Sequence, residues 1–96
     1  MNIVTIKQKL KGSERVLKTQ FSVKKIGVFG SYSRGEQRKN SDIDILVEFI
    51  EEPSFFKFLD LENYLSNLFK IKVDLVMKDT LKPYIGKQIL SEVIYV

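Results

Sequence analysis

Three aspartates are the residues of this chain whose type and spacing most clearly suit chemistry. Asp42 and Asp44 are two positions apart, and within a strand this spacing places both carboxylates on the same face. Asp74 lies in a later apolar segment, residues 73–76. Carboxylates that share a site repel each other unless a cation lies between them. The pattern therefore predicts an oxygen-ligated Mg²⁺ or Mn²⁺ site formed by Asp42, Asp44 and Asp74.

A glycine–serine pair, Gly30 and Ser31, ends an apolar strand and opens a short helix. Glycine lets the backbone approach a phosphate closely, and the first turn of a helix offers free N–H groups. Ser31 could cap that helix and also bond a phosphate oxygen. Arg34 follows one turn later, where it could bond a phosphate or pair with Glu36, Asp42 or a backbone carbonyl. Together with the aspartates, this turn is what metal-assisted attack on a nucleoside triphosphate requires.

Each of these patterns also has a structural explanation. Paired aspartates occur at solvated strand edges, Asp74 could simply face water at a strand end, and a Gly-Ser pair is common in turns. The flanking residues favour the functional interpretation. Ile43 and Ile45 alternate with the aspartates and are expected to face the core, which places two charges on an otherwise buried strand.

Composition limits the alternatives. The chain has no histidine and no cysteine, which excludes Ser-His and Cys-His nucleophilic catalysis and any thiolate or imidazole zinc site. A net charge of +4 fits either a solvated basic surface or a polyanionic substrate such as a triphosphate or RNA. No apolar run approaches a membrane span and no signal peptide begins the chain, so we expect a cytoplasmic protein. Residues 1–96 have room for a single domain.

Helices and strands are predicted to alternate along the chain, which indicates an α/β fold of the α+β kind: a small mixed β-sheet packed with helices. The expected helices are 3–20, with a break near Gly12, then 31–37, 55–69 and 83–91. The expected strands are 24–29, 43–49, 72–77 and 93–96. Ser54 is expected to cap the third helix and Pro83 to open the last. The apolar face of the third helix is expected to comprise Phe55, Phe58, Leu59, Leu61, Leu65, Leu68 and Phe69.

Three segments together resemble the minimal nucleotidyltransferases of the DNA polymerase β superfamily. They are Gly30-Ser-Tyr-Ser-Arg-Gly35, Ser41-Asp-Ile-Asp44 and Val73-Asp-Leu-Val76, and the likeness extends over residues 20–96. The resemblance implies a polymerase β-like fold in which Asp42, Asp44 and Asp74 hold two Mg²⁺ ions. It also implies that Gly30 and Ser31 hold the triphosphate, and that a hydroxyl attacks the α-phosphate in line.

Short members of this kind resemble MNT-type antitoxins, which are encoded beside a HEPN toxin, an RNase. The resemblance implies transfer of AMP from ATP to a tyrosine of that toxin within a hetero-oligomer. Two alternatives stay open: a non-catalytic antitoxin that masks its partner, and a nucleotidyltransferase acting on RNA or on a small molecule. Direct binding of nucleic acid also stays open, because no residue convincingly reads a base edge.

Overall fold

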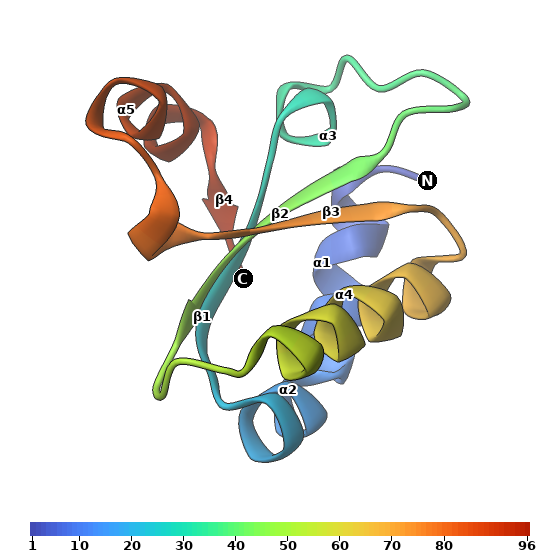
Figure 1. The fold of residues 1–96 in the computed structure, drawn as a ribbon. Coiled ribbons are helices and arrows are strands. Elements are labelled where there is room, and N and C mark those ends of the chain that lie inside the picture. The colour runs from blue at the N-terminus through green and yellow to red at the C-terminus, as the bar shows by residue number, and fades with distance from the viewer.

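A four-stranded mixed sheet organises the fold (Figure 1). The structure is a computed structural model and describes residues 1–96. Strand β1 (Val23–Phe29) pairs antiparallel with both β2 (Ile43–Phe49) and β4 (Ile94–Tyr95). Strand β3 (Val73–Met77) pairs parallel with β2, which gives the order β3-β2-β1-β4. The predicted α+β class and mixed sheet are therefore confirmed.

Helices cover the two faces of this sheet unequally. Helices α1 (Ile3–Gly12), α2 (Glu14–Phe21) and α4 (Phe55–Phe69) pack on one side, whereas α5 (Pro83–Glu92) lies on the other (Figure 1). The short helix α3 (Ser31–Arg34) follows the end of β1, and a 3₁₀ turn (Lys78–Thr80) follows β3. The longest helix has 15 residues, and none is long and apolar enough to cross a membrane.

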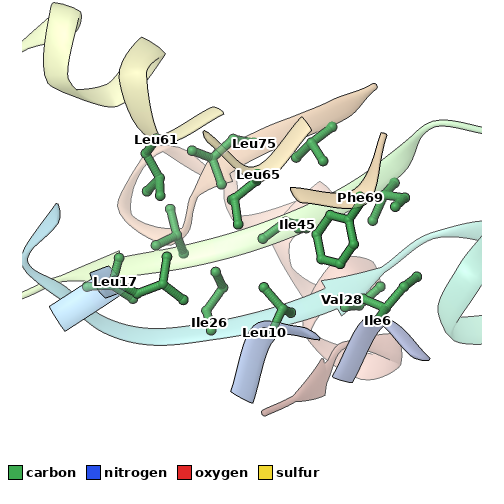
Figure 2. Close-up of a cluster of buried hydrophobic side chains, with 14 of the residues drawn as sticks. Ile6, Leu10, Leu17, Ile26, Val28, Ile45, Leu61, Leu65, Phe69 and Leu75 are labelled. Atoms are coloured by element: carbon green, nitrogen blue, oxygen red, sulfur yellow. The ribbon is translucent and has the colours of Figure 1, made fainter. Parts of the chain in front are cut away.

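Alternating residues of the strands build the core against α1, α2 and α4. Val28 and Ile45 are fully buried on this face of the sheet. Leu10, Leu65 and Phe69 pack against them from α1 and α4 (Figure 2). Because strand side chains alternate between faces, the residues between these apolar ones point to the α5 side. The core thus fixes which side chains are left for a site on the opposite face.

Local signals place the helix ends where they were expected, with some corrections. Ser54 caps α4 by accepting a hydrogen bond from the Lys57 N–H at 3.1 Å, and Pro83 is at the first position of α5. The N-terminal segment breaks at Ser13 into two helices. Helix α3 ends at Arg34 and not near residue 37, because Gly35 adopts a left-handed conformation (φ 70°) that terminates it.

One predicted core residue is wrong. Phe55 was expected on the apolar face of α4, but it is 69% exposed. It stands at the first position of the helix, just after the loop at residues 51–54, and its ring packs edge-on against Phe56, which is also exposed. The buried stripe of α4 consists of Leu61, Leu65 and Phe69.

Candidate functional site

A pocket of about 520 Å³ opens on the α5 side of the sheet. The turn between β1 and α3, the starts of β2 and β3, and the C-terminal half of α5 form its walls. All six residues singled out from the sequence line it: Gly30, Ser31, Arg34, Asp42, Asp44 and Asp74. The structure therefore brings together residues that are up to 44 positions apart in the chain.

Strand register places the aspartates next to one another. Asp44 of β2 is the register partner of Asp74 of β3, and Asp42 stands just before β2 begins. Ile43 and Ile45 are fully buried on the core side, so the aspartates face the pocket, as expected. Asp42 and Asp74 have side chains that are 39% and 47% exposed, and thus remain accessible to a ligand.

Asp44 has a carboxyl group whose pKa is shifted by its surroundings. Burial raises the pKa of its carboxyl above the ordinary value, and the negative charges of Asp74, Asp42 and Glu92 raise it further, while Arg34 lowers it. A carboxylate in this environment is stabilised by any cation that enters the pocket. The electrostatics at Asp44 therefore favour binding of a cation.

A lysine supplies part of the missing positive charge. The Lys72 ammonium lies 3.7 Å from Asp42 Oδ2 and 3.9 Å from Asp74 Oδ1, on a side chain that is 72% exposed. No group of three or more Asp, Glu, His or Cys side chains in residues 1–96 is gathered closely enough to hold a metal ion as it stands. The three carboxylates nevertheless fit Mg²⁺, which prefers carboxylate oxygens. Asp42 and Asp74 already share one positive charge, that of Lys72.

The Gly30 turn packs directly on Asp44. Gly30 has φ 75° and ψ −152°, a conformation open almost only to glycine, and a Cβ added there would overlap the Asp44 carboxylate. Ser31 is the first residue of α3 and not its cap; the cap position belongs to Gly30, without a side-chain cap hydrogen bond. The expected capping role of Ser31 is therefore wrong, and its hydroxyl is free to face a ligand.

Arg34 adopts the pairing that the sequence had left as one of several options. Its guanidinium contacts Glu36 at 3.3 Å and Glu92 at 2.9 Å, and these hydrogen bonds raise its pKa. Glu92, the last residue of α5, also accepts a hydrogen bond from the Gly30 N–H at 3.0 Å. Sequence reasoning missed Glu92. The available signal was an acidic side chain at a helix C-terminus, where the helix dipole disfavours negative charge.

Comparisons with known proteins find relatives that are similar in sequence and in fold. The family model described as "Nucleotidyltransferase domain" matches residues 10–96. Protein adenylyltransferase MntA of Thermococcus cleftensis is 49% identical over 96 residues, covering 100% of this chain and 97% of that protein. A solved structure provisionally named a minimal nucleotidyltransferase superposes with a TM-score of 0.82 at 31% identity, over 98% of this chain and 95% of that one. A toxin–antitoxin structure with AMP-PNP reaches a TM-score of 0.73 at 26% identity, covering 88% of this chain and 70% of that one.

Proposed function

Since the chain belongs to the nucleotidyltransferase domain family, we propose that it transfers AMP from ATP to a hydroxyl of a partner protein. Two findings support this: the relative MntA is named a protein adenylyltransferase, and a similar solved structure is a toxin–antitoxin pair with AMP-PNP. The partner we propose is a HEPN-type toxin in the cytoplasm. The acceptor is a tyrosine of that toxin, and its modification silences the toxin.

The observation that carries the proposal is the single pocket shared by three carboxylates and the Gly30 turn. Asp42, Asp44 and Asp74 would hold two Mg²⁺ ions, and Gly30 and Ser31 would hold the triphosphate. Bound Mg²⁺ would supply positive charge that offsets the charge of the phosphates in the transition state. The low exposure of the strand residues beside Asp44 strengthens such electrostatic effects within the pocket.

The reaction needs few groups from the protein. The acceptor oxygen forms a bond to the α-phosphorus, and the bond from that phosphorus to the oxygen bridging to the β-phosphate breaks. Pyrophosphate leaves with the electron pair. Asp74 is suited to take the hydroxyl proton, since its carboxylate lines the pocket and is half-exposed, so that an acceptor side chain can reach it.

One experiment tests this assignment against two of its alternatives, a masking antitoxin and an RNA nucleotidyltransferase. The protein is incubated with α-labelled ATP, Mg²⁺ and either the product of the neighbouring reading frame or RNA, and both species are analysed by mass spectrometry. We expect an added AMP on a tyrosine of the partner and none on RNA. Tight binding of the partner without added AMP would show a masking antitoxin, and label on RNA would show an RNA nucleotidyltransferase.

The exposed start of α4 is the partner surface that we favour. Phe56 is 76% exposed, an unusual position for a large aromatic side chain. Tyr64 was the other candidate, but it is half-buried and packs on Phe21 with ring centroids 5.5 Å apart. Phe56 is therefore available to a partner, whereas Tyr64 mainly supports the margin of the core.

We expect Phe56→Ala to weaken partner affinity by about ten- to thirtyfold, as truncation of a buried interface aromatic does. Titration calorimetry with the purified partner measures this effect. Tyr84→Ala is the matched control, because Tyr84 is 90% exposed on α5, away from α4. Unchanged affinity in Phe56→Ala and Tyr64→Ala combined would remove this surface of α4 from consideration.

A further inference from the structure

Glu92 connects two segments of the pocket that are far apart in sequence. Its carboxylate is 19% exposed, and each of its oxygens has a separate partner. Oε1 accepts the Gly30 N–H at 3.0 Å, and Oε2 accepts Arg34 Nη1 at 2.9 Å. The end of α5 is thus tied to both ends of α3 through one side chain.

This carboxylate occupies an electrostatically costly place. It stands at the C-terminus of a ten-residue helix, where the helix dipole is negative. It also adds to the negative charge that acts on Asp44. The two hydrogen bonds, one of them to a guanidinium, are what offsets these costs. A side chain kept in such a position by specific contacts is expected to act through those contacts.

The contact with Gly30 is the one that bears on the site. The Gly30 backbone lies so close to Asp44 that a side chain at position 30 would overlap the Asp44 carboxylate. A small movement of this turn therefore changes where Asp44 can lie, and it also moves Ser31, the next residue. Arg34 holds the second oxygen of Glu92, so it stabilises the same turn from the other end of α3.

We propose that Glu92 is a positioning residue of the nucleotide site, which holds the Gly30 turn against Asp44, and that Arg34 acts through Glu92 rather than on a phosphate. This inference rests on the proposed function, because it assumes that the pocket takes a nucleoside triphosphate. It assigns a role to the end of α5, and it replaces the phosphate-binding role that the sequence suggested for Arg34.

Binding of α,β-methylene-ATP with Mg²⁺, measured by titration calorimetry without any acceptor, tests the proposal. We expect Glu92→Ala to raise the dissociation constant about tenfold, the loss typical of a charge-assisted hydrogen bond. Glu92→Gln is expected to fall between wild type and Glu92→Ala, because its amide oxygen can still accept the Gly30 N–H. Glu36→Gln is the matched control: it removes the charge of the exposed partner of Arg34 and leaves the Gly30 contact intact, so we expect wild-type binding.

A second measurement on the same variants distinguishes a positioning role of Glu92 from a purely structural one. Partner affinity is expected to stay at the wild-type value in Glu92→Ala, at a temperature where its melting curve shows a folded protein. Nucleotide binding as tight as wild type in Glu92→Ala would overturn the proposal. Tighter binding would also overturn it, since the carboxylate would then be competing with phosphate for the Gly30 N–H. The calorimetric assay contains no acceptor and therefore does not depend on transfer. A wild-type protein that binds nucleotide but does not modify the toxin would refute only the proposed function.

Discussion

Replacing Asp44 with asparagine is expected to abolish AMP transfer to the partner while the chain stays folded. The substitution removes the charge of the carboxylate and keeps its volume. It takes away the acid whose pKa is raised by burial and, further, by the negative charges of Asp74, Asp42 and Glu92. Loss of one such electrostatic contribution corresponds to a rate reduction of about three orders of magnitude or more. Transfer of label from α-labelled ATP to the partner measures the rate.

Asp79→Asn is the matched control for this prediction. It makes the same change of charge on the 3₁₀ turn after β3, outside the pocket, and it is expected to transfer AMP at the wild-type rate. Near wild-type transfer by the double variant Asp42→Asn, Asp44→Asn would contradict the metal-assisted mechanism. Loss of transfer in Asp79→Asn as well would show that the assay responds to general charge and not to the site.

The carboxylate arrangement could be predicted because it depends on local rules. Alternation along a strand settles the face on which Asp44 lies, since Ile43 and Ile45 must be buried. The same alternation around Asp74 places it on the pocket side once β3 pairs with β2. The register match between Asp44 and Asp74 then follows from parallel pairing that buries Val73 beside Ile43.

The features that escaped prediction depend on where separate elements end. Glu92 meets Gly30 across 62 positions, and this contact exists only because α5 terminates beside the turn after β1. No periodicity in the sequence specifies that placement. Phe55 has the spacing of a core residue, but its exposure follows from its position at the start of α4, ahead of the first buried turn. Ser31 does not cap α3, because Gly30, in a conformation open almost only to glycine, already occupies the cap position.

The apo protein is expected to melt at a lower temperature than its Asp44→Asn variant at neutral pH, by a few degrees. Without a metal, the ionised Asp44 carboxylate is destabilised by its burial and by repulsion from Asp74, Asp42 and Glu92, and Lys72 offsets only part of this repulsion. Asparagine removes the repelled charge. Asp60→Asn, on the exposed side of α4, is the matched control and should melt as wild type.

The sign of the pH dependence follows from the raised pKa of Asp44 in the folded chain. Such a group contributes stability that is fully present below its unfolded pKa, about 3.9, and is lost as pH rises through the raised folded pKa. The difference in melting temperature between wild type and Asp44→Asn should therefore be small at acid pH and appear on going to neutral pH. A difference that is independent of pH would contradict ionisation of the Asp44 carboxyl as its cause.

Ligand should reverse the order of the melting temperatures of wild type and Asp44→Asn. Mg²⁺ and ATP at about 100 times the dissociation constant add about 2.7 kcal/mol to the free energy of unfolding, which for a domain of this size is a shift of about 10 to 20 °C. Asp44→Asn should lose most of that shift, because the charge that binds the cation also destabilises the apo state. The same carboxylate thus has opposite effects on the two melting curves, which a loss of general stability cannot produce. Equal ligand shifts in wild type and variant, or no shift in wild type, would show that these carboxylates do not form the metal–nucleotide site.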